Sequence, residues 1–76
     1  MKKKLLLKAF VQAADPDTLR ILHLESGWSV TSDDALLMRP NGRSSFDTPE
    51  QALRVLAGVG IRCAVIEWDG LEAITE

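Results

Sequence analysis

The residues that most often carry chemistry are scarce in this sequence of 76 residues. It has one cysteine, Cys63, one histidine, His23, and no tyrosine. A single cysteine excludes an internal disulfide bond and any zinc site built from several thiolates. Cys63 opens the apolar run 63–66, so we predict a buried and unreactive thiol. His23 stands between two leucines and lacks the spaced partners of a catalytic or metal-binding histidine, which predicts a histidine on a sheet surface.

Long apolar runs are also missing. No stretch approaches the ~20 apolar residues that span a membrane, so we expect no membrane partner. The lysines at positions 2, 3 and 4 and the three leucines after them are similar to the start of a secretion signal, but Lys8 ends the apolar run. A signal needs an apolar region of ~7–15 residues. We therefore expect a cytoplasmic protein.

Patterns typical of catalysis and of cofactor binding are absent as well. Four aspartates lack the spacing of a calcium loop and are better explained by turns, where carboxylates accept from nearby backbone amides: Asp15, Asp17, Asp33 and Asp34. The serines lack the glycine-flanked elbow of a hydrolase nucleophile. Gly58-Val59-Gly60 follows a predicted helix, whereas a phosphate-binding loop precedes one. We predict no catalytic, cofactor-binding or metal-binding residue, and hence a protein that is not an enzyme.

The charge balance argues against a protein that coats nucleic acid, because such proteins need a basic surface. The formal net charge is −2 and the isoelectric point is about 5.3. Two groups of basic residues still leave open a small nucleic-acid-binding regulator as the alternative: Lys2, Lys3 and Lys4, and Arg39 and Arg43. A helix-turn-helix over 19–38 is disfavoured, because it would place the Asp33 carboxylate in the core.

The composition is that of a folded protein, with 46% hydrophobic and 26% charged residues. A chain of this length makes one domain, 1–76, with a thin core, so we expect a homodimer or a permanent protein partner. The clearest element is a helix from 49 to about 58. Thr48 is its predicted cap, Pro49 suits its first position, and Gln51 completes a capping box. Glycines 58 and 60 end it.

Strands are predicted on both sides of that helix. The apolar, β-branched run 61–68 predicts a central strand, and Asn41-Gly42 between 35–39 and 43–46 predicts a hairpin. A second hairpin is predicted from 19–24 and 28–31. Residues 3–13 fit a strand or a short helix, with the strand favoured because a cap is missing, and Asp15-Pro16-Asp17 predicts a turn. The predicted fold is α+β, a small antiparallel sheet of four or five strands with one helix, about 49–58, packed on one face.

Binding to a partner protein would use exposed arginine and tryptophan side chains. Arg39, Asn41 and Arg43 surround the predicted hairpin tip, which would present two cations to an acidic partner. Trp28 and Trp68 are the other candidates, since tryptophan is enriched at the centres of interfaces. Solubilising arginines and core-filling tryptophans are the competing interpretations of these residues.

The stretch 42–56, GRSSFDTPEQALRVL, resembles a segment of small uncharacterised accessory proteins of plasmids, integrative elements and phages. In these proteins a strand that ends in an aromatic residue leads into a capped helix, and a Gly-Ile pair then opens the next strand, as Gly60-Ile61 does here. Some phage-encoded anti-CRISPR proteins are similar in size and begin a helix with a comparable Phe-Asp-Ser/Thr sequence. The resemblance covers about 25 of the 76 residues. It implies a non-enzymatic, protein-binding accessory protein of a mobile genetic element that inhibits a host defence complex. A minor enzyme subunit, completed by another chain, is a further alternative.

Overall fold

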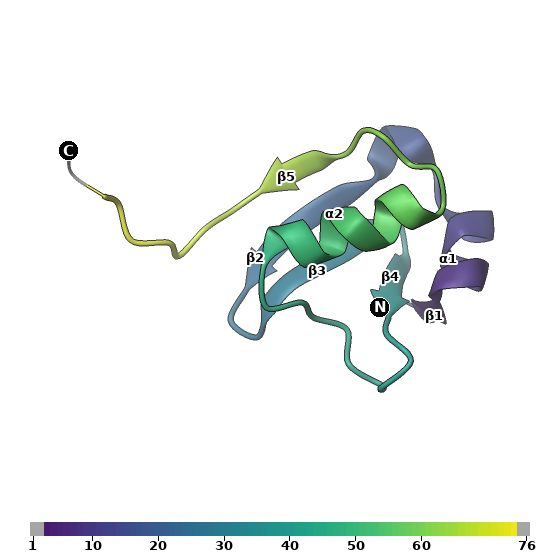
Figure 1. Ribbon diagram of the computed structural model, residues 1–76, viewed down its shortest axis with the longest axis horizontal. Helices are drawn as coiled ribbons and strands as arrows, with labels where there is room; N and C mark the ends of the chain where they lie inside the picture. The colour runs from purple at the N-terminus through teal and green to yellow at the C-terminus, as the bar shows by residue number, and fades with distance from the viewer. Residues whose placement is uncertain (1–2, 75–76) are drawn as a thin grey trace.

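A five-stranded sheet forms the centre of the protein in the computed structural model, which describes residues 3–74 (Figure 1). Lys2, part of the predicted basic patch, lies outside these residues. The elements are, in chain order, β1 (Lys3–Leu6), α1 (Leu7–Ala13), a short 3-10 helix (Pro16–Thr18), β2 (Arg20–Leu24), β3 (Gly27–Ser32), β4 (Ala35–Met38), α2 (Pro49–Gly58) and β5 (Val65–Glu67).

The strands lie in the order β1-β4-β3-β2-β5, and the sheet is mixed. β3 runs antiparallel to both of its neighbours, whereas β1 pairs with β4 and β5 pairs with β2 in parallel. The predicted α+β class is confirmed, but the prediction of a purely antiparallel sheet was wrong. Hairpin signals are local, whereas parallel neighbours are joined by long connections that leave no signature at a turn.

The hairpin predicted from 19–24 and 28–31 is confirmed as β2 and β3. Ile21 lies opposite Val30 and His23 opposite Trp28, with Glu25 and Ser26 in the connection. The segments that a helix-turn-helix would need as helices are strands here, which excludes that alternative.

The hairpin predicted around Asn41-Gly42 does not form. The turn exists, since the Gly42 amide donates to the Arg39 carbonyl at 2.9 Å, but the returning chain does not pair with β4. Both sides of β4 are already occupied, by β1 and β3. Phe46 pairs with Trp28 of β3 instead, through backbone bonds of 2.8 and 2.7 Å. Residues 39–45 are therefore a loop between two segments that line the same side of β3.

Residues 3–13 combine both of the predicted alternatives, since β1 is followed directly by α1. The prediction of a strand throughout was wrong beyond Leu6. Leu5 and Leu7 both pack against the core, and Phe10 follows Leu7 at helical spacing and is fully buried. The cap position of α1 is Leu6, which has no side-chain cap bond, and this explains why no capping signal is visible in the sequence.

The run 61–68 was predicted as a central strand, but only Val65–Glu67 form a strand, and it lies at the edge of the sheet. Val65 is 53% exposed, and Cys63 is exposed rather than buried. The Ile61 amide donates to the Leu56 carbonyl at 3.0 Å, so this part of the run closes the end of α2. The apolar residues of 61–68 therefore fall into two parts. The first part lies against the end of α2, and the second forms the edge strand β5.

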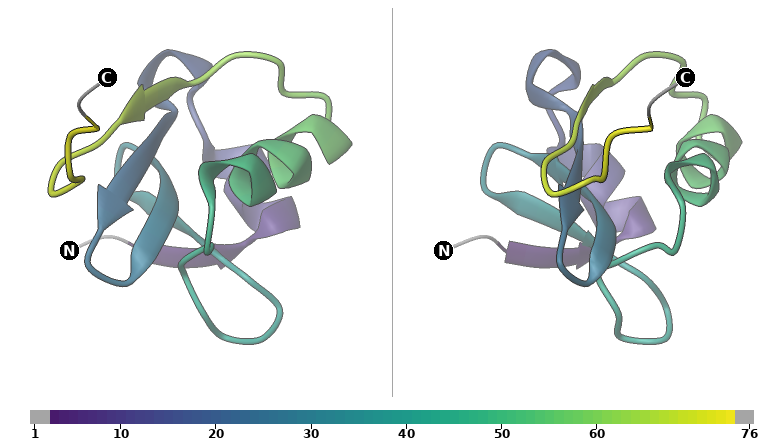
Figure 2. Two further views of the ribbon diagram at one scale, coloured as in Figure 1. Left: turned by 60° about the vertical axis from the view of Figure 1, so that its left-hand side comes forward. Right: turned by 90° about the vertical axis from the view of Figure 1, so that its left-hand side faces the viewer.

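Both helices contribute to one hydrophobic core, so the prediction of a single helix on the sheet was incomplete. Phe10 of α1 and Leu56 of α2 share a cluster with the sheet residues Ile21 and Val30, which places both helices against the same face. Figure 2 shows α2 lying along that side of the sheet. The buried apolar residues are Phe10, Leu19, Ile21, Val30, Ala35, Leu37, Phe46, Ala52 and Leu56.

No helix within residues 3–74 is both long and apolar enough to span a bilayer.

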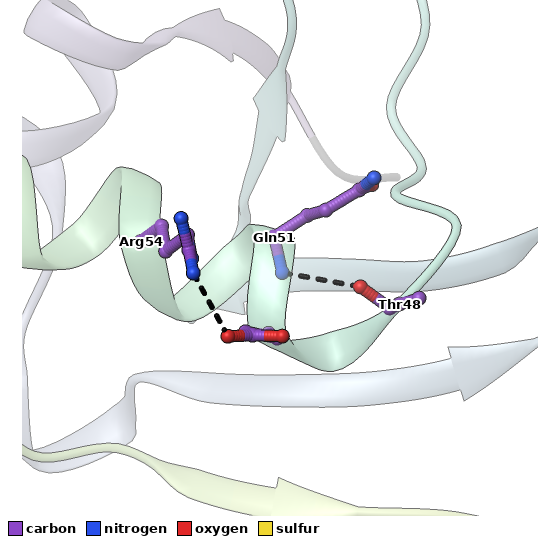
Figure 3. A network of polar contacts seen from close by, with 4 residues as sticks. Thr48, Gln51 and Arg54 are labelled. Carbon is purple, nitrogen blue, oxygen red and sulfur yellow. Dashed lines mark hydrogen bonds and ion pairs between the residues drawn. The ribbon is translucent and has the colours of Figure 1, made fainter.

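Helix α2 begins where the sequence predicts. The Thr48 hydroxyl accepts from the Gln51 amide at 3.3 Å, and Arg54 pairs with Glu50 one turn below (Figure 3). The Gln51 side chain accepts from the Asp47 amide at 3.0 Å, one residue before the position that a capping box uses. Asp15 caps the predicted 15–17 turn in the same way, by accepting from the Asp17 amide.

Removing the helix cap gives a first test of the fold. Thr48→Ala leaves the Gln51 amide without its acceptor, so we expect the free energy of unfolding to fall by about 1 kcal/mol in a urea titration. Thr48→Ser keeps the hydroxyl and should stay within about 0.5 kcal/mol of the parent. An equal loss of unfolding free energy in both variants would show that the Thr48 hydroxyl does not stabilise the start of α2.

Candidate protein-binding surface

The loop 39–45, called here the arginine loop, is closed by its own backbone. The Arg39 amide donates to the Arg43 carbonyl at 2.6 Å, and the Asn41 side chain accepts from the Arg43 amide at 2.9 Å. Ser29 of β3 is buried and donates from its hydroxyl to the Ser44 carbonyl at 2.9 Å. These bonds fix the loop between Arg39 and Arg43 and again at Ser44. They limit the conformational entropy that the loop would lose on binding a partner.

The two arginines of this loop have different surroundings. The Arg39 guanidinium lies 4.8 Å from the centre of the Phe46 ring and donates to the Ser45 carbonyl at 3.2 Å. Arg39 is half-buried, and its guanidinium is held to the loop by this bond and by the Phe46 ring. Arg43 is exposed and presents its side chain to solvent. The Asn41 carboxamide oxygen is engaged within the turn.

An apolar cleft of about 290 Å³ lies beside the arginine loop. It is lined by the following residues of β4, the 39–46 segment, α2 and the start of α1: Leu7, Leu37, Met38, Arg39, Pro40, Phe46 and Val55. Arg39 is the one charged residue of this lining. Pockets for drug-sized ligands span roughly 300–1,000 Å³, so this cleft has room for one or two side chains rather than for a large cofactor.

Trp28 of β3 contacts the core, His23 and Phe46. It packs against the core, and its ring centre lies 4.8 Å from that of His23 in a tilted arrangement. Its backbone carries both bonds to Phe46. Trp28 therefore fixes the chain at the end of the arginine loop through its backbone, and its side chain is half-buried.

Trp68 lies elsewhere. It follows β5, whereas the arginine loop follows β4, and β3 and β2 separate these two strands in the sheet. Trp68 is 65% exposed. The His23 ring bonds to the carbonyl of Asp69 at 2.6 Å, which holds the chain just after Trp68 to the end of β2. The structure thus places Arg39, Asn41 and Arg43 in one loop, pairs the residue after that loop, Phe46, with Trp28, and leaves Trp68 apart.

Several residues of the cleft were not candidates from the sequence. Leu7, Met38 and Val55 come from three separate elements, and each looks like an ordinary core residue in its local pattern. Only the fold brings them together.

Among residues 3–74, no three side chains of histidine, cysteine, aspartate or glutamate converge as a metal site would require.

Comparison of the chain with protein-family models, with curated proteins and with solved structures finds no match.

Proposed function

We propose that this protein is a non-enzymatic accessory protein of a mobile genetic element that binds a protein partner and thereby inhibits a host defence complex. The single observation that supports binding is the apolar cleft beside a loop that is fastened by its own hydrogen bonds. The link to mobile elements rests on the resemblance of residues 42–56 described above.

The lining of the cleft indicates what it would accept. An apolar side chain of the partner would enter between Leu7, Met38 and Val55. A carboxylate next to that side chain would meet Arg39, which lines the cleft, and further along the loop the exposed Arg43. Arginine suits this contact because its planar guanidinium can bind both oxygens of a carboxylate.

Reversing the charge of the exposed arginine in the arginine loop tests this proposal. Tagged protein captures its partner from an extract of host cells, the partner is identified and purified, and its affinity is measured. Arg43→Glu is expected to weaken binding at least about tenfold, because it places a carboxylate opposite the partner's acidic group. Arg54→Glu is the matched control, since Arg54 is also exposed but lies on α2, where it pairs with Glu50.

Two outcomes contradict the proposal. Equal affinity in the parent and in Arg43→Glu would remove the arginine loop from the interface. Capture of nucleic acid in place of a protein, with an affinity that falls steeply with salt, would favour the alternative of a nucleic-acid-binding regulator.

A further inference from the structure

The two edges of the sheet are protected to different degrees. β1, at one edge, carries the exposed Lys3 and Lys4, and lysines on an edge strand oppose pairing with another chain. At the other edge, residues 63–66 carry no charge, and β5 pairs only with β2 among residues 3–74 (Figure 1). The outer side of β5 is therefore the edge that can accept a further strand.

The backbone groups on that outer side can be assigned from the bonds that β5 makes to β2. The Val65 amide donates to the Leu19 carbonyl at 3.3 Å, and the Asp69 carbonyl bonds to the His23 ring at 2.6 Å. Successive residues of a strand direct their backbone groups to opposite sides. The amide and carbonyl of Ile66 therefore point away from β2, toward the outer side of the edge.

Trp68 is the largest exposed side chain at this edge, with 65% of its surface exposed. It lies two residues beyond Ile66, so the alternation of side chains along a strand places both on one face of the sheet. Ile66 packs against the core that includes Leu56 of α2. Trp68 therefore lies on the side of the sheet that α2 covers (Figure 2).

An apolar cleft of about 230 Å³ lies on that side, between α2 and the segment that leads into β5. Leu53 and Ala57 line it from α2, and Ile61 and Ala64 line it from the segment. An apolar cavity of about 150 Å³ can hold a benzene molecule, so this cleft has room for an indole ring.

Trp68 cannot fill the cleft of its own chain, because it lies four residues beyond Ala64, or roughly 13 Å along an extended strand. Antiparallel pairing with β5 of a second copy, centred on Ile66, removes this separation. Ala64 and Trp68 stand two residues before and two residues after Ile66, so Trp68 of each copy lies opposite Ala64 of the other. A two-fold axis perpendicular to the sheet keeps both tryptophans on the face where the clefts lie.

The charges near this edge also favour antiparallel pairing. Arg62 precedes β5, whereas Glu67 and Asp69 lie at its end. Antiparallel neighbours bring the start of one strand beside the end of the other, so each arginine lies near carboxylates of the partner. A register centred on Glu67 would instead place two like charges directly opposite each other.

We propose that the protein forms a two-fold dimer in which the β5 strands pair antiparallel about Ile66 and Trp68 of each copy enters the cleft between α2 and residues 61–64 of the other. Both copies use the same surface, so the contact is self-complementary and the assembly closes at two chains. The bond between His23 and Asp69 stays in place. The proposal is independent of the partner-binding function above, since the arginine loop follows β4 and lies away from β5.

Truncation of the tryptophan tests the contact by sedimentation equilibrium. Trp68→Ala is expected to raise the dimer dissociation constant at least about tenfold, because it empties both clefts of their aromatic side chain. Leu6→Ala is the matched control, since Leu6 is 49% exposed but lies on β1, at the other edge. Circular dichroism confirms that each variant is folded.

A charge placed at Val65 tests the register. Val65 is 53% exposed and would lie opposite the partner's Glu67, twice in each dimer. Val65→Glu should raise the dissociation constant at least about tenfold, because carboxylates then face each other. Val65→Lys should dimerise at least about tenfold more tightly than Val65→Glu, because each lysine faces a carboxylate.

The proposal is overturned if the parent sediments as one chain at every concentration, or if Trp68→Ala dimerises as tightly as the parent. Equal dissociation constants for folded Val65→Glu and Val65→Lys would contradict the register centred on Ile66. Masses that grow beyond two chains would contradict a self-complementary contact.

Discussion

Gly27→Ala is expected to lower the free energy of unfolding by about 3 kcal/mol or more. Gly27 has a φ of +126°, a conformation that side chains rarely adopt, and a Cβ atom there would lie 2.4 Å from the Phe46 carbonyl oxygen. The Phe46 carbonyl belongs to the backbone and cannot rotate aside as a side chain could, so β3 and the 45–46 segment must move apart. The movement strains or breaks the two bonds between Trp28 and Phe46.

The magnitude combines two effects. Backbone strain of this kind amounts to about 1–3 kcal/mol, and each lost backbone bond contributes about 1 kcal/mol. A domain of this size has a total stability of roughly 4–11 kcal/mol, so the change removes a large part of it. Thermal or urea unfolding followed by circular dichroism measures the loss.

Gly60→Ala separates the two effects. Gly60 also has a positive φ, +85°, but nothing lies within 4 Å of an added Cβ. Only the backbone conformation is then disfavoured, by about 1–2 kcal/mol. If Gly27→Ala lowered the free energy of unfolding no more than Gly60→Ala does, the Phe46 carbonyl could not lie as close to β3 as described.

Phe10→Ala is expected to destabilise the protein by about 3–5 kcal/mol, the range for removing a buried aromatic side chain. Phe10 is fully buried, and it is the residue through which α1 enters the core. Its removal leaves a cavity between α1 and the sheet, and the short α1 has no side-chain cap to hold it in place. Urea unfolding gives the value.

Gln12→Ala is the matched control on the same helix. Gln12 is exposed, so its truncation should change the free energy of unfolding by less than about 0.5 kcal/mol. A similarly small effect of Phe10→Ala would mean that α1 does not pack on the sheet.

Elements defined by local signals were predictable from the sequence. The cap at Thr48 and Pro49 predicts the start of α2, glycines 58 and 60 predict its end, and the short connection between β2 and β3 predicts their hairpin. The parallel pairs were not predictable, because the partners of β1 and β5 lie far away in the sequence. Cys63 was predicted as buried because apolar runs usually are, yet part of this run lies over the end of α2 and part at an edge.

The candidate surface was predictable only in part. The Asn41-Gly42 turn predicts that Arg39 and Arg43 lie close together, and both belong to the arginine loop. The distinction between a half-buried Arg39 and an exposed Arg43 depends on the Phe46 ring, which reaches Arg39 because the chain returns to β3. The apolar cleft depends on contacts between elements that no local pattern encodes.

The return of Phe46 to β3 has an evolutionary consequence. Residues 35–38 and Phe46 pair with the same edge of β3, and the arginine loop connects them. The loop begins and ends at backbone hydrogen bonds, and doubling the length of such a loop costs only about 0.6 kcal/mol in closure entropy. Residues 40–42 lie between the bonded Arg39 and Arg43 and can therefore be lengthened or replaced while the scaffold stays intact, which lets this loop diversify faster than the fold that carries it.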